Sequence, residues 1–413
     1  MANCSALEQL VDIDNYIALI RNQTNFDEAL LLPCQRQICL AIWGEGNPDI
    51  SGIGVSVGYV IEVGLGFLLG AAVLAVQADR LQRRRRRRRR WWWCRGLDRV
   101  LDAALDSFVD CALFFALAVQ LASLVMLVQK DLVSVAARGF GANDARIATA
   151  NSVVCILPLL HPLAACAAAA HEDSDREEDR PPPPVELDER PQRRRHLDRC
   201  FEEAKSDTRF ALFYLLTLLF FVPFVLQCIH NWGPSRIGDG PTGDGTVVAS
   251  EAEWGATLRV CFGDVRQFST AEMAAIAVFE LLGSLVVFGF AIGRLSLAAL
   301  RRSRWRRAVA GVTENLTGSD GRIGVRLSVV LLLVPLVPAV PLLWGIFRLR
   351  HIQGKLADRI ESPYTGNEWG FGQIIGLVIF APVLTEARTA WKLRGPGRRR
   401  IQDAQGCTAT HPP

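Results

Sequence analysis

Three ionisable side chains fall inside long apolar runs, where they could hold or move a charge within a membrane. Glu62 interrupts "GIGVSVGYVIEVGLGFLLG", Glu280 interrupts "AAIAVFELLGSLVVFG", and His161 lies in "LPLLHPL". An ionisable residue in the middle of a membrane span costs about 2.5–3.5 kcal/mol on insertion scales, so it normally faces the protein interior or a water-filled cavity. The three residues therefore predict an intramembrane proton or cation site, or else three hydrogen-bonded packing groups.

Small residues surround Glu62 at a regular spacing. Glycine recurs at every fourth position, as Gly54, Gly58, Gly66 and Gly70, with Glu62 in the remaining place. Residues four apart share one face of a helix, and small residues at this spacing let two membrane helices approach closely. We expect this face to pack on a neighbouring helix and to carry Glu62 into the protein.

The elements that must position these residues are membrane-spanning helices. Half of the 413 residues are hydrophobic, mean hydropathy is +0.20, and apolar segments of about 20 residues recur, long enough to cross a hydrocarbon layer of about 30 Å. Lipid offers no partner for open backbone groups, so helices are favoured. We predict an all-α integral membrane protein, a bundle of seven transmembrane helices over residues 53–76, 107–127, 147–169, 210–228, 273–294, 327–347 and 370–391.

Two local patterns refine these segments. Pro335, Pro338 and Pro341 each remove a backbone donor from the sixth span, so we expect that span to be kinked or locally unwound. Ser269 and Glu272 have the spacing of a capping box, which indicates a helix start before the fifth span.

Basic residues predict the orientation. They favour the segments 78–106, 170–209, 295–326 and 392–413 over the other connections by more than two to one, which is the positive-inside pattern. The N-terminus is then outside, residues 1–52 form an extracellular tail, and residues 392–413 form a basic cytoplasmic tail. We expect a plasma-membrane protein with glycosylation possible at Asn3 and Asn22, which begin outer Asn-x-Ser/Thr sequons.

Cysteines on the outer side could form disulfides, because the exterior is oxidising. We expect a Cys34–Cys39 clasp and a Cys228–Cys261 bridge, with free thiols as the alternative. The sequence lacks cysteine and histidine spacing typical of a zinc site, and we expect no metal and no cofactor.

The cytoplasmic segments carry the strongest charge features. The run Arg83–Arg90 precedes three tryptophans, a combination that suits anionic lipid headgroups better than nucleic acid. The alternative is that the run only reinforces the topology.

An acidic stripe follows, formed by Asp98, Asp102, Asp106 and Asp110. Like charges four residues apart disfavour a helix, so we expect either neutralisation by the preceding arginines or a cation-binding stripe. The loop 170–209 is charged and proline-rich, typical of a disordered linker that could hold a cytoplasmic partner.

Two stretches carry a resemblance. "NPDISGIGVSVGYVIE" leads into the first span and "NEWGFGQIIGLVIFAPVL" into the last. Together they resemble a group of functionally uncharacterised fungal multi-span membrane proteins that pair D-I-x-G-I-G-V with W-x-F-G-Q-I. The matched residues are Asp49, Ile50, Gly52, Gly54, Val55, Trp369, Phe371, Gly372 and Gln373. The resemblance implies a fungal source and a shared membrane architecture, without an activity.

The sequence indicates only a broad class of function. The sequence contains no P-loop, dinucleotide fingerprint or metalloprotease motif, so an enzyme is not favoured. Seven spans with an outer N-terminus favour a surface sensor or receptor-like signalling component, although topology alone does not establish function. The alternatives are a proton- or cation-coupled transporter or channel using Glu62 and Glu280, and a structural or scaffolding membrane protein.

Overall fold

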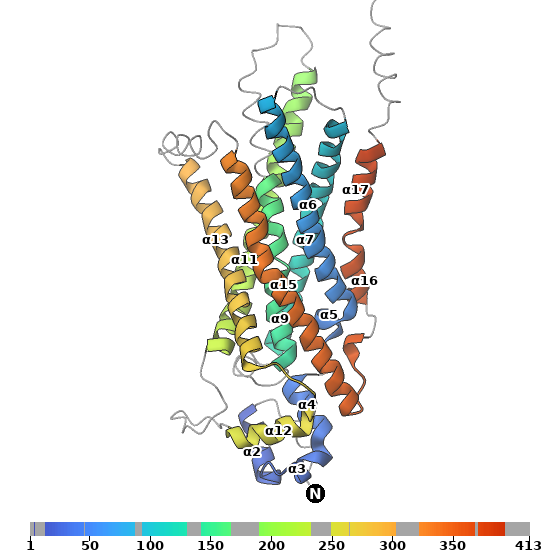
Figure 1. Ribbon diagram of the computed structural model, residues 1–413, viewed down its shortest axis with the longest axis vertical. Coiled ribbons are helices and arrows are strands. Elements are labelled where there is room, and N and C mark those ends of the chain that lie inside the picture. Colours follow the sequence, from blue (N-terminus) through green and yellow to red (C-terminus); the bar gives the residue numbers. More distant parts are fainter. Residues whose placement is uncertain are drawn as a thin grey trace, which may run out of the picture.

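The architecture is taken from a computed structural model. It describes residue 4 and residues 13–44, 46–86, 93–129, 142–166, 190–232, 249–263, 265–302, 322–367 and 371–392. Every extended regular element in these ranges is a helix. The helices form two connected parts, a long bundle and a small cap at the end of the bundle where the N-terminus lies (Figure 1).

The bundle contains seven segments that are long and apolar enough to cross a membrane. They overlap all seven predicted spans, which confirms an all-helical chain with seven candidate spans. The helices that form them are α6 (Ile53–Arg86), α7 (Trp93–Gln129), α9 (Ala142–Val154) with η2 (Leu157–Leu159), α11 (Arg190–Trp232), α13 (Thr270–Arg302), α15 (Arg322–Arg359), and α16 (Phe371–Val378) with α17 (Ala381–Lys392).

The third segment is the centre of the bundle. Of its most apolar 18-residue window, 94% is buried inside the protein, against 17–50% for the other six segments. Its helix is also broken: α9 ends at Val154, a turn follows at Cys155, and η2 begins at Leu157. Pro158 has no N–H, so it cannot donate to the carbonyl of Val154, and the regular hydrogen-bond ladder stops there.

Proline has a different effect in the sixth span. α15 stays helical through Pro335, Pro338 and Pro341, so the expected local unwinding of this span is not found. The described breaks lie instead in the third segment and between α16 and α17. The predicted capping box at the start of α13 is confirmed, because Ser269 N donates to Glu272 Oε2 at 2.7 Å and Glu272 N donates to Ser269 Oγ at 3.2 Å.

The cap folds around its own hydrophobic core. It is formed by α2 (Ile13–Thr24), α3 (Glu28–Leu31), η1 (Leu32–Cys34), α4 (Gln35–Trp43) and α12 (Glu251–Phe262). Ile352 and Leu356 near the end of α15, and Ile360 directly after it, belong to the same core. The described part of the segment that we expected as a tail is therefore a packed structure that shares a core with the sixth span. The short α5 (Pro48–Ser51) then leads into α6.

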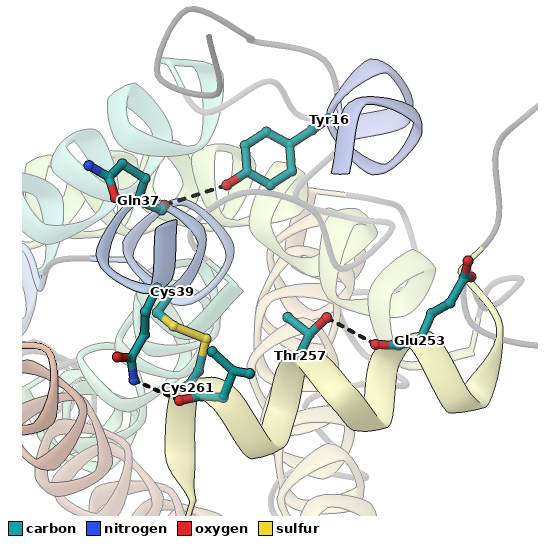
Figure 2. The surroundings of a disulfide bond; sticks show 8 residues. Tyr16, Gln37, Cys39, Glu253, Thr257 and Cys261 are labelled. Atoms are coloured by element: carbon teal, nitrogen blue, oxygen red, sulfur yellow. Dashed lines mark hydrogen bonds between the residues drawn. A yellow bond between two sulfur atoms is a disulfide. The ribbon is translucent and has the colours of Figure 1, made fainter. Parts of the chain in front are cut away.

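Two disulfides hold the cap. Cys4 pairs with Cys34, and Cys39 pairs with Cys261, which joins α4 to α12 across 222 residues of sequence (Figure 2). The expected Cys34–Cys39 and Cys228–Cys261 pairings are therefore wrong, and Cys228 is a free thiol. Spacing along the chain suggested the first pairing, whereas the packing of α12 against α4 brings Cys261 to Cys39.

Candidate functional site

A pocket lies between the cap and the bundle. Its volume is about 350 Å³, within the range of small-molecule sites. Four aromatic side chains form much of its wall, namely Trp43, Trp254, Phe262 and Phe268. Trp43 packs against two of the others, because its ring centroid lies 5.4 Å from that of Trp254 and 4.8 Å from that of Phe262. These contacts make a rigid apolar surface that suits the body of an organic ligand.

Backbone geometry fixes Trp43 at this position. α4 ends at Trp43, and the next residue, Gly44, has a φ of +91°. A Cβ at Gly44 would collide with the carboxylate of Asp144, so only glycine allows this approach. Asp144 Oδ1 also accepts a hydrogen bond of 2.7 Å from Gln353 Nε2. The end of α4, the start of α9 and the end of α15 therefore meet at one buried polar contact beside the pocket.

The pocket continues into the bundle as a narrower cleft. Arg146, Phe268, Met273 and Leu349 line both spaces, and the deeper one has a volume of about 30 Å³, enough for about two water molecules. Glu280 lines the deeper space and is 4% exposed. A ligand that enters from the cap would meet aromatic surface first, then the guanidinium of Arg146, and then the carboxyl group of Glu280.

Charged and covalent contacts hold the cap half of the pocket. Arg21 on α2 makes two hydrogen bonds of 2.7 Å to the carboxylate of Glu253 on α12. Arg21 is the main reason that the pKa of Glu253 lies below its usual value, with a smaller contribution from the backbone N–H of Ser250. Gln35 Nε2 also donates to Val260 O at 2.7 Å, beside the Cys39–Cys261 disulfide.

Glu62 lies elsewhere, on the opposite side of the third span from Glu280. It is 0% exposed, in agreement with the burial that the glycine spacing predicts, and its electrostatic neighbours are Tyr59 and Cys155. A Cβ on Gly283, one turn beyond Glu280, would contact Val153 on α9. The third span therefore lies between the two glutamates, and Glu62 is not among the residues that line either pocket described here.

The glycine face packs as predicted. A Cβ on Gly58 would meet the backbone of Gly376 on α16 at 3.1 Å, one on Gly66 would meet Pro158 at 2.9 Å, and one on Gly70 would meet His161 at 2.9 Å. Gly66 contacts Pro158, and Gly70, four residues later on α6, contacts His161, three residues later in the third span. The first and third spans therefore run in the same direction, as alternate spans of a bundle should. Gly54 differs, since its N–H donates to the side chain of Gln373.

His161 joins the first span rather than Glu280. Its Nδ1 lies against Gly70, its side chain is 4% exposed, and Nδ1 has no hydrogen-bond partner among the described residues. The three residues expected to form one intramembrane site are thus divided: Glu62 and His161 lie where the first and third spans pack together, and Glu280 lines the deeper cleft.

Basic residues from another helix neutralise the acidic stripe. Arg209 on α11 binds Asp106 Oδ1 at 2.8 Å and Asp110 Oδ1 at 2.6 Å, and Lys205 lies 3.4 Å from Asp106 and 3.5 Å from Asp110. The cations that neutralise these two carboxylates thus come from α11, about 100 residues later in the chain, so neither expected role of the stripe describes Asp106 and Asp110.

Several predicted features fall outside the described residues. These are Asn3, the side chain of Asp98, the side chains of Arg83–Arg90, residues 170–189 of the linker and residues 393–413 of the tail. Residues 190–209, which we expected to belong to the disordered linker, are instead the helical start of α11. Asn22 is described and is exposed on α2. Among the described residues, no group of three or more His, Cys, Asp or Glu side chains could hold a metal ion.

Comparisons with known proteins add no identity. No family profile, no curated protein and no solved structure matches the chain.

Sequence reasoning missed most of the pocket. Trp43 and Trp254 belong to segments that we expected as a tail and a loop, and their meeting depends on a disulfide between distant cysteines. Arg146 carried a usable signal, because it lies in the polar run "NDARIATANS" at the start of an expected apolar span, and polar residues in a membrane helix normally face the protein interior.

Proposed function

We propose that this chain is a receptor-like membrane sensor that binds a small amphipathic organic molecule between its cap and its bundle. The pocket of about 350 Å³ is the observation that carries the proposal. Its aromatic wall suits an apolar body, and Arg146 and Glu280 offer opposite charges along the path into the bundle. The pocket is formed by both parts of the chain, so an occupant would contact the cap and the spans together.

The proposed orientation places the cap outside the cell, in the plasma membrane. The positive-inside pattern supports this orientation, and so does the presence of both disulfides in the cap, because disulfides persist on the oxidising side of a membrane. A pocket under the cap would then face the exterior, and the basic segments 78–106 and 170–209 would face the cytoplasm, near anionic lipid and any signalling partner.

Ligand binding can be tested by thermal unfolding of the purified full-length chain against a set of small aromatic and amphipathic molecules. A ligand of the folded state raises the unfolding temperature with its concentration. We expect stabilising compounds whose effect is lost in Trp254→Ala and Arg146→Gln, and kept in Trp391→Ala, an exposed tryptophan on α17. No stabilising compound, or equal stabilisation of the pocket variants, contradicts the proposal.

Signalling is tested separately by removing segments that carry none of the described contacts. A chain without residues 170–189 and 393–413 should still bind a stabilising compound but lose the cellular response to it. This design keeps Arg209 and the rest of α11. If the shortened chain keeps every phenotype of the intact chain, the sensor proposal fails and a scaffolding role is favoured.

The structure gives little support to a transporter that uses Glu62 and Glu280 as one site, because the third span lies between them. Flux through proteoliposomes that is lost in both Glu62→Gln and Glu280→Gln would nevertheless restore that alternative.

A further inference from the structure

A group of buried oxygen atoms without hydrogen-bond partners lies around the break in the third span. Both carboxylate oxygens of Glu62 are in this group, together with Gln120 Oε1, Ser123 Oγ and Asn151 Oδ1; none of them has a hydrogen-bond partner among the described residues. Unpaired buried polar atoms cost about 1–3 kcal/mol each, so a set of them in one region of the core calls for an occupant.

Cys155 is a common neighbour of Glu62 and Gln120. Gln120 Nε2 lies 3.8 Å from Cys155 Sγ, and Cys155 is an electrostatic neighbour of the Glu62 carboxylate. Ser123 follows Gln120 by three residues on α7, so the two side chains share a helix face. Asn151 lies one turn before Cys155, on the N-terminal side of the break.

Hydrogen bonds fix the orientation of the side-chain amides of Gln120 and Asn151, and they leave the two amide oxygens unpaired. Gln120 Nε2 donates to Ser152 O at 2.7 Å, and Asn151 Nδ2 donates to Ile50 O at 2.9 Å. A backbone carbonyl can only accept, so in each amide the nitrogen must be the atom that faces it. The oxygens Oε1 and Oδ1 are thereby fixed as the free ends, and both are acceptors.

The break leaves two backbone carbonyls without their α-helical donors. Pro158 cannot donate to Val154 O, and Pro162 cannot donate to Pro158 O, because proline has no N–H. Pro158 O lies 3.1 Å from the position of a Cβ on Gly66, one turn along α6 from Glu62. Unwound backbone carbonyls in a membrane helix are suited to bind Na⁺ or H⁺.

We propose that Glu62 binds a small monovalent cation, such as Na⁺, with Gln120 and the broken third span as further oxygen ligands. The site offers acceptors and one carboxylate, so a single positive charge neutralises it. Ca²⁺ and Mg²⁺ would keep an uncompensated charge, and the described residues include no group of three His, Cys, Asp or Glu side chains that could supply the further negative charge. This inference uses none of the residues of the ligand pocket, and it stands or falls independently of the proposed sensor function.

The first test is the unfolding temperature of the detergent-solubilised full chain in NaCl and in choline chloride at equal ionic strength. We expect Na⁺ to raise it along a saturating curve. Glu62→Gln removes the charge at nearly constant volume, so this variant should unfold at the same temperature in both salts. Glu386→Gln, the same substitution at an exposed position of α17, should respond as the wild type does.

A wild-type chain indifferent to Na⁺, or a Glu62→Gln variant with the wild-type response, overturns the proposal. So does stabilisation by acid alone in choline, because Glu62 would then hold a proton and no metal cation. Direct binding of radioactive ²²Na⁺ to the wild-type chain covers the case in which the variant does not fold. We expect saturable binding that unlabelled Na⁺ displaces and choline does not, and the absence of saturable binding also overturns the proposal.

Discussion

Gln373 Oε1 accepts a hydrogen bond of 2.9 Å from the backbone N–H of Gly54, 319 residues earlier in the chain. The contact joins the start of the last span to the first turn of the first span. Asp49 Oδ1 also lies close to Gly372, 3.0 Å from the position of its Cβ. The segment that leads into the first span and the segment that leads into the last span therefore touch, so Asp49, Gly54 and Gln373 have a structural role at this junction.

Gln373 should be sensitive to substitution. Gln373→Leu leaves the N–H of Gly54 without its acceptor in a buried place, and we expect a loss of about 1–3 kcal/mol of unfolding free energy. Ile374→Ala is the control, because Ile374 is 51% exposed on the outer surface of the helix. Thermal unfolding of both variants measures the difference; equal losses would mean that the hydrogen bond contributes little.

Arg209 should be important for the stability of the bundle at the end far from the cap. Breaking a buried ion pair costs about 3–5 kcal/mol. Here we expect less, about 2 kcal/mol, because the side chains of Asp106 and Asp110 are 47% and 40% exposed. Arg209→Gln should therefore lower the unfolding temperature clearly, and adding Asp106→Asn and Asp110→Asn should recover part of the loss. Lys205→Gln is the matched control, since exposed pairs contribute about 0–1 kcal/mol.

The Cys39–Cys261 bridge should stabilise the cap. Replacing both cysteines with serine should cost about 2–5 kcal/mol and should weaken binding of any ligand in the pocket, because the bridge holds α12 against α4. Cys228→Ser should have little effect on unfolding. Mass spectrometry after alkylation without reduction should find Cys228 modified and a disulfide-linked peptide pair that contains Cys39 and Cys261; a linked pair that contains Cys228 and Cys261 would restore the pairing that the sequence suggested.

Acid should loosen the cap through Glu253. Arg21 lowers the pKa of Glu253 in the folded chain below its usual 4.5, so this contact stabilises the cap fully above the unfolded pKa. The stabilisation is lost as the pH falls from about 4.5 through the lower folded pKa. Hydrogen exchange of α12 should accelerate over that interval. Glu253→Gln should flatten this part of the pH dependence, and an unchanged profile would assign it to other carboxylates.

Glycosylation tests the orientation. Asn22 is exposed on α2, so a cap outside the cell predicts a glycan there that disappears in Asn22→Gln. The sequon at Asn315 lies on a predicted inner segment and should carry none. A glycan at Asn315 would reverse the orientation and place the cap in the cytoplasm.

Sequence patterns predicted the features that are determined within a single helix. Hydropathy located all seven candidate spans, and the glycine spacing predicted the burial of Glu62, because both follow from local periodicity. Features that depend on two distant segments were missed. Arg209 reaches Asp106 from 103 residues away, and Cys39 finds Cys261 rather than the nearer Cys34.

The position of the helix break shows the same limit. Three prolines in α15 predicted a kinked or locally unwound sixth span, yet the helix is continuous, and a described break lies in the third span, where Pro158 packs against Gly66 of α6. Whether a proline interrupts a helix depends on the neighbours that accept or replace its lost hydrogen bond, and those neighbours are tertiary.

The core shared by the cap and α15 has a mechanical consequence. α15 has 38 residues, a length of about 57 Å, and one of its ends is part of the cap core through Ile352 and Leu356. The cap cannot shift without carrying that end of the helix with it. A tilt of about 5° over such a length moves the far end by about 5 Å. Under the proposed sensor function, this single helix would act as a lever between an occupied pocket and the far end of the bundle.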